Sequence, residues 1–282
     1  MDHASGNLLV FINGGKLADV KVFISADIEG CCGITHWDEA KRSHPDYPAF
    51  RDQMQREVVA ACQGALDAGA ATIRVRDAHG SARNLDPWGL PEPAHLVREW
   101  SAHPYMMVQD LDASFDALVL IGYHAPGGSG GNPLAHTLSG DYAEVRVNGE
   151  RMSEFHLYSR MAAQLGVPTV AVSGDAALCA LVQAADRRTL TVSSGAGRGR
   201  SMLARHPAEV ARDIRSMVAT ALPQRFVPAP PQGPFHLQVQ YRDQRLAYRG
   251  GFYPGARQVD ARLVELTVQD WVDVLRALLF LR

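Results

Sequence analysis

Four short apolar segments, each followed within three residues by an acid or a histidine, constrain the fold more than any other feature of this sequence. They occupy residues 22–24, 72–75, 117–121 and 169–172 and are rich in Val, Ile and Leu. Continuous apolar runs such as 22–24 are typical of strands buried on both faces. Apolar residues at helical spacing lie between them, at 51–68 and 153–165. This order predicts an α/β fold with a mainly parallel sheet flanked by helices.

A proline-rich segment indicates the domain organisation. Residues 223–234 hold five prolines in twelve positions, which is typical of a stiff connection. We therefore expect an α/β domain at 21–222, which holds all the candidate site residues described below, and a smaller C-terminal α+β lobe at 223–282. That lobe should contain strands at 235–241 and 262–266 and a helix opened by Thr267. Residues 1–20 match no part of this pattern, and we interpret them as an N-terminal extension or leader.

Composition argues against several classes of protein. Lys and Arg number 28 against 30 for Asp and Glu, so a formal charge of −2 gives no footprint for nucleic acid or an anionic membrane. The apolar run at 8–12 is too short for a membrane span or a secretory signal. The four cysteines lack C-x-x-C spacing, so we expect no disulfide framework and a reducing, cytoplasmic location.

Two carboxylates follow the first apolar segment. In the sequence Ser-Ala-Asp-Ile-Glu-Gly at 25–30, Asp27 and Glu29 are two positions apart, and both point to one side if the strand continues. Such close carboxylates repel each other unless a proton or a cation lies between them. Two divalent metals bridged by a carboxylate would satisfy this requirement. Two solvated loop acids are the alternative, and this pair alone does not decide between them.

His79 and His124 follow the second and third apolar segments. Ligands of parallel sheets lie beyond the carboxyl ends of the strands, where these histidines and the two acids should meet. Each histidine alone is more often a hydrogen-bonded structural residue than a ligand. Together with the acids they favour a metal site, for zinc or less commonly manganese. Asp77 either orients His79 or belongs to a turn.

Two further candidates lie downstream. The glycine-rich segment 127–131 lacks the Lys-Ser/Thr ending of a P-loop, which favours a substrate loop over a phosphate cradle. His136 lies just beyond it, and beside a metal site it would serve as a proton shuttle or oxyanion donor. Glu154 begins a predicted helix after the Asn148-Gly149 turn. It is either a ligand or an acid that complements the helix dipole.

These motifs, taken in order, resemble the zinc D-aminopeptidase family. The resemblance covers about residues 21–282 and begins with the signature Ser-x-Asp-x-Glu-Gly at 25–30. It continues through Asp77-x-His79, residues 120–125, Ala135-His136-Thr137, Glu154, Ser173-Gly174-Asp175 and Tyr253-Pro254-Gly255. The chain departs from the family at Cys31-Cys32 and in the expanded glycine segment, both expected close to the substrate.

The resemblance implies a dinuclear zinc site with two ions per subunit. Asp27 would bridge the ions, and the other ligands would be Glu29, His79, His124 and Glu154. His136 would be the catalytic residue outside the metal shell. The resemblance also implies release of N-terminal D-amino acids from short peptides, and assembly into a homo-oligomeric ring, a decamer.

The sequence therefore predicts a metallo-aminopeptidase that acts on short peptides. An acid such as Glu29, Glu154 or Asp175 would anchor the cationic amine of the substrate. The alternative is a small-ligand-binding protein that uses the same metal for stability and performs no turnover.

Overall fold

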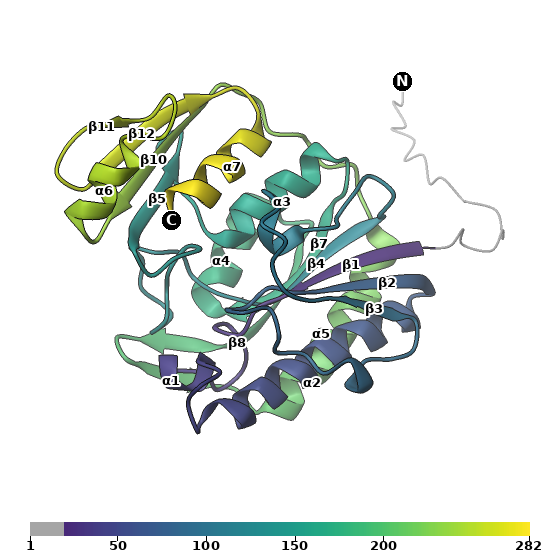
Figure 1. Cartoon of the computed structure of the whole chain (residues 1–282). Coiled ribbons are helices and arrows are strands. Elements are labelled where there is room, and N and C mark those ends of the chain that lie inside the picture. Colours follow the sequence, from purple (N-terminus) through teal and green to yellow (C-terminus); the bar gives the residue numbers. More distant parts are fainter. Residues whose placement is uncertain (1–19) are drawn as a thin grey trace, which may run out of the picture.

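A seven-stranded sheet forms the centre of the computed structural model, which describes residues 20–282 (Figure 1). The strand order is β3-β2-β1-β4-β7-β8-β9, and all neighbours are parallel except β8 and β9. The strands are β1 Val20–Ala26, β2 Ala70–Asp77, β3 Ala94–Val97, β4 Ala117–Tyr123, β7 Thr169–Asp175, β8 Leu190–Arg198 and β9 Ser201–Ala204. The predicted α/β fold with a mainly parallel sheet is confirmed.

Apolar side chains on both faces bury the central strands. In β1, Phe23 packs into the core on one face, while Val22 and Ile24 pack into the core on the other. All three side chains are fully buried. Since burying one such side chain contributes roughly 1.5–3 kcal/mol, the two cores fix this strand firmly in the middle of the sheet.

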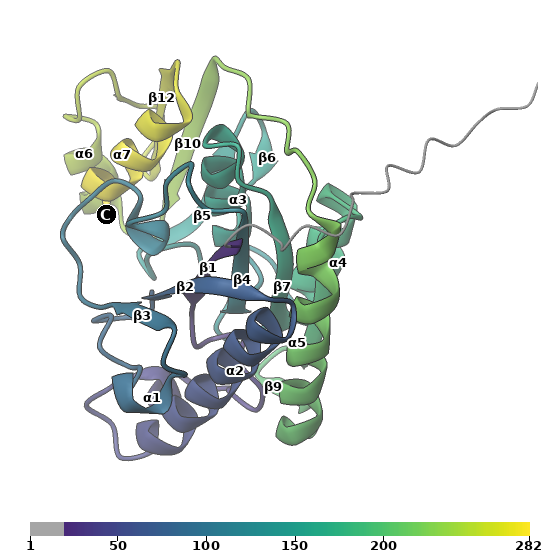
Figure 2. The ribbon, with the colours of Figure 1, turned by 90° about the vertical axis from the view of Figure 1, so that its right-hand side faces the viewer.

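Helices cover both faces of the sheet. Helices α2 (Tyr47–Asp67) and α5 (Pro207–Ala221) lie side by side on one face (Figure 2). They approach closely at Gly64, where a Cβ atom would lie 2.3 Å from the carbonyl oxygen of Arg215. Helices α3 (Glu154–Gln164) and α4 (Ala176–Ala185) contribute to the core on the opposite face. The short helix α1 (Trp37–Ala40) precedes α2.

A second, antiparallel sheet extends the core beyond α3. Its strand order is β11-β12-β10-β5-β6, with β5 Tyr142–Val147, β6 Glu150–Arg151, β10 Phe235–Tyr241, β11 Arg257–Gln258 and β12 Leu263–Val268. Helices α6 (Gln244–Gly250) and α7 (Trp271–Leu281) pack with it, and the Trp271 indole donates a hydrogen bond to the Leu157 carbonyl of α3. Strands from before and after the proline-rich segment pair here, and the boundary at 222/223 stays a prediction.

Local predictions have mixed outcomes. The Asn148-Gly149 turn is confirmed: both residues have positive φ and connect the antiparallel strands β5 and β6. The prediction that Thr267 opens the last helix is wrong. Thr267 pairs with His236 in the β10–β12 ladder, and the helix begins at Trp271. A β-branched residue is well suited to this ladder, so strand pairing prevailed over the cap.

Two further predictions concern the N-terminal extension and membrane spans. The predicted extension at 1–20 lies outside the described residues apart from Val20, which begins β1. Within residues 20–282, no helix is long and apolar enough to cross a bilayer.

Gly30 allows the loop after β1 to lie directly against the end of β4. A Cβ atom on Gly30 would lie 1.8 Å from the carbonyl oxygen of Tyr123, and the Gly30 amide donates to the Gly122 carbonyl at 2.8 Å. No side-chain rotation relieves a clash with backbone atoms. Any larger residue must therefore displace the loop that carries Asp27 and Glu29.

We predict that Gly30→Ala lowers the free energy of unfolding by about 1–3 kcal/mol or more, because it forces two backbone segments apart. Gly130→Ala is the matched control, since Gly130 is exposed and a methyl group added to it would have no atom within 4 Å. Urea denaturation of both variants measures the difference. Equal stability of the two variants would contradict the prediction.

Candidate metal centre

The carboxyl ends of three adjacent strands carry four of the predicted site residues. Asp27 and Glu29 follow β1, His79 follows β2, and His124 follows β4, with β1 between the other two. Glu154 is the first residue of α3, and His136 lies in the segment between β4 and β5. The structure brings all six predicted residues together although they span 128 sequence positions, from 27 to 154.

The ligand candidates form two groups that share Asp27. In the first, His79 Nδ1 lies 3.3 Å from Asp27 Oδ1 and 3.1 Å from Glu29 Oε2. In the second, His124 Nε2 lies 3.5 Å from Asp27 Oδ2 and 3.4 Å from Glu154 Oε2. Each group offers one imidazole, one carboxylate of its own and one oxygen of Asp27. This arrangement has the donor set for two cations with a bridging carboxylate.

Each histidine is oriented by the backbone. His79 Nε2 donates to the Ala40 carbonyl at 2.8 Å, and His124 Nδ1 donates to the Ala125 carbonyl at 3.0 Å. A carbonyl oxygen can only accept, so these bonds fix the tautomer and leave the inner nitrogen as a lone-pair donor. Metal-binding histidines in proteins are held in this way.

Among residues 20–282, three side-chain atoms of the site are buried without a hydrogen-bond partner. They are Glu29 Oε2 in the first group, and His124 Nε2 and Glu154 Oε2 in the second. The other oxygen of Glu154 accepts a bond from the Leu138 amide at 2.7 Å. Because buried polar atoms are nearly always satisfied, the three atoms indicate that each group has a missing partner.

The pKa values of the site residues also show that ionisable groups are crowded together here. Burial and the charge of Glu29 raise the pKa of Asp27 to about 7. Burial disfavours the charged form of His79, but the charges of Glu29 and Asp27 and the hydrogen bonds to them together outweigh burial and raise the pKa of His79 well above its usual value. The pKa of His124 is raised in the same manner by Glu154. Without a cation, protons are held between groups that would otherwise repel each other.

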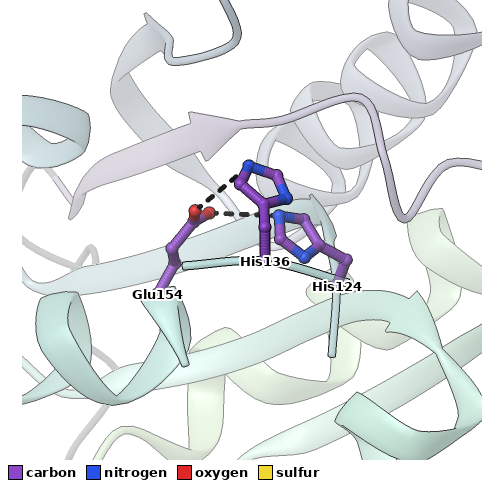
Figure 3. A group of neighbouring side chains, drawn as sticks. All are labelled: His124, His136 and Glu154. Atoms are coloured by element: carbon purple, nitrogen blue, oxygen red, sulfur yellow. Dashed lines mark ion pairs between the residues drawn. The ribbon is translucent and has the colours of Figure 1, made fainter. Parts of the chain in front are cut away.

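His136 lies against the second group, and its ring is close enough to His124 and Glu154 that these three residues could also hold an ion together. Its ring stacks on that of His124, with centroids 4.3 Å apart and planes 11° apart, and Trp37 contacts its other side at 5.2 Å. Its Nδ1 donates to the Leu134 carbonyl, and its Nε2 lies 3.8 Å from Glu154 Oε1. Figure 3 shows the Glu154 carboxylate facing both imidazoles. Burial lowers the pKa of His136, and the charge of His124 adds to this effect.

Comparison with known proteins places the chain in a family. The D-aminopeptidase family model matches residues 20–280. The chain belongs to the D-aminopeptidase family. Members of this family are peptidases.

Two relatives from Bacillus subtilis agree with this assignment. A D-aminopeptidase is 28% identical over 159 residues, so the match spans about half of each protein, 55% of this chain and 56% of the relative. The solved structure of the Zn-dependent D-aminopeptidase DppA, described as a self-compartmentalizing protease, has a TM-score of 0.87 at 22% identity. It covers 93% of this chain, and this chain covers 96% of it. The fold is therefore shared over nearly the whole length.

Asp77 and Asp175 have structural roles in this family member. Asp77 accepts bonds from the amides of Asn84 and Leu85, so it is the turn residue of the two alternatives. The expectation that Asp175 anchors a substrate amine is wrong. Asp175 is fully buried, and its oxygens accept from the amides of Ala125 and Leu178. It caps α4 and holds the strand end that carries His124.

The two departures from the family pattern adjoin the site residues: the Cys31 thiol donates to the Asp27 carbonyl at 3.3 Å, and a Cβ atom on Gly127 would lie 3.5 Å from the His136 backbone. Cys31 and Cys32 are buried, and the Cys32 amide donates to Glu57 of α2 at 2.8 Å. Neither they nor residues 127–131 line the cavity of about 400 Å³ that opens onto Asp27, Glu29 and Glu154. The interpretation of 127–131 as a substrate loop stays a prediction. Trp37, Trp100 and Leu138 are among its apolar walls.

Asn132 is a functional residue that sequence analysis missed. Its amide nitrogen donates to the Glu29 carbonyl at 3.0 Å and to Asp175 Oδ2 at 3.1 Å, while its oxygen accepts from the Leu134 amide. It therefore connects the Glu29 loop to the segment that carries His136. Its hydrogen-bond partners lie up to 103 positions away in the sequence, so no local pattern predicts them. The position of Asn132 directly after the glycine-rich segment was the one local feature that could have drawn attention to it.

We predict that Asn132→Ala lowers the free energy of unfolding by about 1–3 kcal/mol, because it leaves buried carbonyl and amide groups unpaired. Gln232→Ala, at an exposed position, is the control and should change stability little. Urea denaturation distinguishes the two. If Asn132→Ala matched the control, the network would not be what holds these loops together.

Proposed function

We propose that the chain is a dinuclear zinc aminopeptidase that releases N-terminal residues, preferentially D-residues, from short peptides. The observation that carries the proposal is the position of Asp27, whose two oxygens face two separate histidine–carboxylate groups. Family membership and the zinc dependence stated for DppA support the choice of peptide substrate and metal. The D-preference rests on the names of these relatives.

The residues present match the requirements of two zinc ions. Asp27 would bridge them, His79 and Glu29 would complete one site, and His124 and Glu154 the other. Nitrogen and carboxylate donors suit zinc, with manganese as the less common occupant. The unpartnered atoms of Glu29, His124 and Glu154 support this assignment, because each needs a partner that the chain does not provide.

The chemistry assigned to each part follows from its position. When bound, two zinc ions would polarise the scissile carbonyl and lower the pKa of a water molecule toward neutrality. His136 is fixed by its bond to Leu134, which leaves Nε2 free to accept a proton. Its lowered pKa keeps it neutral near pH 7 and thus ready to act as a base. It would then return the proton to the leaving amine.

The cavity is of a size for short peptides. About 400 Å³ accommodates a few residues, with Trp37, Trp100 and Leu138 as apolar walls. The amine of an unblocked peptide would be received at the end of the cavity where Asp27, Glu29 and Glu154 lie. A free N-terminus is therefore part of the proposed specificity.

Assembly and location are also proposed. The self-compartmentalizing description of DppA supports a homo-oligomer, and we propose a ring decamer that restricts access to short peptides. The four buried free cysteines are compatible with a reducing, cytoplasmic compartment.

We predict that His136→Ala retains two zinc equivalents but loses turnover about 10²–10⁴-fold, the usual scale for acid–base catalysis. His79→Ala and His124→Ala, which remove proposed ligands, should lose metal. Elemental analysis after incubation with zinc, combined with single-turnover kinetics, measures both. Loss of metal from His136→Ala comparable to that from His79→Ala would overturn its assignment as the proton carrier. Absence of turnover by the zinc-loaded parent protein would instead favour a binding protein.

We predict that D-Ala-D-Ala is cleaved faster than L-Ala-L-Ala and that N-acetyl-D-Ala-D-Ala is a poor substrate, because acetylation removes the cationic amine. The measurement is kcat/KM for the three peptides at one zinc concentration. Faster cleavage of the L,L peptide would reject the D-preference alone. Efficient cleavage of the acetylated peptide would reject the aminopeptidase.

A further inference from the structure

A second cavity adjoins the one at the metal centre. Its volume is about 640 Å³, and it shares Trp37, His79 and Gly80 with the smaller cavity. His79, a proposed metal ligand, therefore lies at the junction of the two. A peptide whose scissile bond lies beside His79 would extend from one cavity into the other.

The larger cavity, here called the basic cavity, differs in charge from its neighbour. Its lining contains Lys41, Arg42 and Arg83, and no carboxylate. Among residues 20–282, neither Lys41 nor Arg42 has an ion-pair partner within 4 Å; Arg83 pairs with the exposed Glu99 at 3.4 Å. The metal-site cavity, by contrast, is lined by Asp27, Glu29 and Glu154, which are proposed metal ligands, and by Arg282. The basic residues thus lie on one side of His79 and the proposed metal ligands on the other.

Direct hydrogen bonds hold the basic cavity at a fixed position beside the metal centre. The Ala40 carbonyl, next to Lys41, accepts the bond from His79 Nε2. The Arg42 guanidinium donates to the Arg83 carbonyl, which ties the two basic segments together. Asn84 follows Arg83 and donates to the His79 carbonyl at 2.7 Å. The same bonds that orient His79 therefore position these cations.

We propose that the basic cavity binds a substrate carboxylate on the C-terminal side of the scissile bond, the α-carboxylate of a di- or tripeptide. This inference rests on the proposed aminopeptidase function. One residue spans at most about 3.3–3.6 Å, so the carboxylate of a dipeptide lies within a few ångströms of the cleaved bond. An unblocked short peptide ends in a carboxylate, and the basic cavity presents the cationic side chains of Lys41, Arg42 and Arg83 on that side of the bond.

This arrangement favours peptides of two or three residues over longer ones. Charge-assisted bonds from Lys or Arg to a carboxylate are about twice as strong as neutral ones. A peptide of two or three residues engages both ends, whereas a longer chain carries its carboxylate beyond the basic cavity. An acidic side chain next to the cleaved bond offers the same chemical group, and the experiment separates these two sources.

The test compares D-Ala-D-Ala, D-Ala-D-Ala amide and D-Ala-D-Glu amide as substrates of the zinc-loaded protein. We expect the free acid to exceed the alanine amide in kcat/KM by about 10-fold or more, mainly through KM. The double variant Lys41→Gln with Arg42→Gln should reduce this ratio to about 3-fold or less. Arg187→Gln removes an exposed cation that lines neither cavity and should leave the ratio unchanged.

The outcomes separate the inference from the proposed function. Equal cleavage of the free acid and the amide, or a ratio unchanged in the double variant, overturns the carboxylate site while the aminopeptidase stands. If D-Ala-D-Glu amide is cleaved faster than D-Ala-D-Ala amide, and the double variant loses this difference, the carboxylate site accepts a side-chain carboxylate as well as an α-carboxylate. If no peptide is cleaved, the proposed function fails. Calorimetric titration of zinc-loaded His136→Ala with the free acid and the amide then still decides the site, since equal affinities reject it.

Discussion

Three carboxylates and three imidazoles are buried together at the carboxyl edge of the main sheet, and much of the structure holds these ionisable groups in place. Asp27, Glu29 and Glu154 are each at most 3% exposed. Burying ionised carboxylates this close together is unfavourable unless cations accompany them. The surrounding backbone satisfies the outer nitrogens of His79 and His124 and leaves the inner atoms without partners. The chain thus supplies every part of the site except the positive charge at its centre.

The fold delivers these groups by packing backbone against backbone. Gly30 lets the loop after β1 lie on the end of β4, and Asn132 ties that loop to Asp175 and to the segment of His136. These contacts cross more than one strand, so displacement of any one loop moves several donors together. At the edge of this centre, Trp37, His79 and Gly80 line both the metal-site cavity and the basic cavity.

Sequence alone predicted the part of the site that parallel strands determine. Buried apolar runs located β1, β2 and β4, and adjacency of strand ends then brought Asp27, His79 and His124 together. Glu154 remained ambiguous, because its approach depends on how α3 packs on the sheet, which no local pattern encodes. Asn132 and Trp37 were missed for the same reason: their partners lie about 100 residues away. The surface that residues 127–131 face could not be predicted, because glycine content indicates conformational freedom but not which surface a loop faces.

The central claim, that Asp27 lies between two metal ions, is tested most directly by anomalous diffraction at the zinc edge from crystals of the zinc-loaded protein. We predict two peaks about 3.5–4 Å apart, one beside each oxygen of Asp27, the first contacting His79 and the second His124. A single peak, or two peaks that do not share Asp27, would contradict this claim.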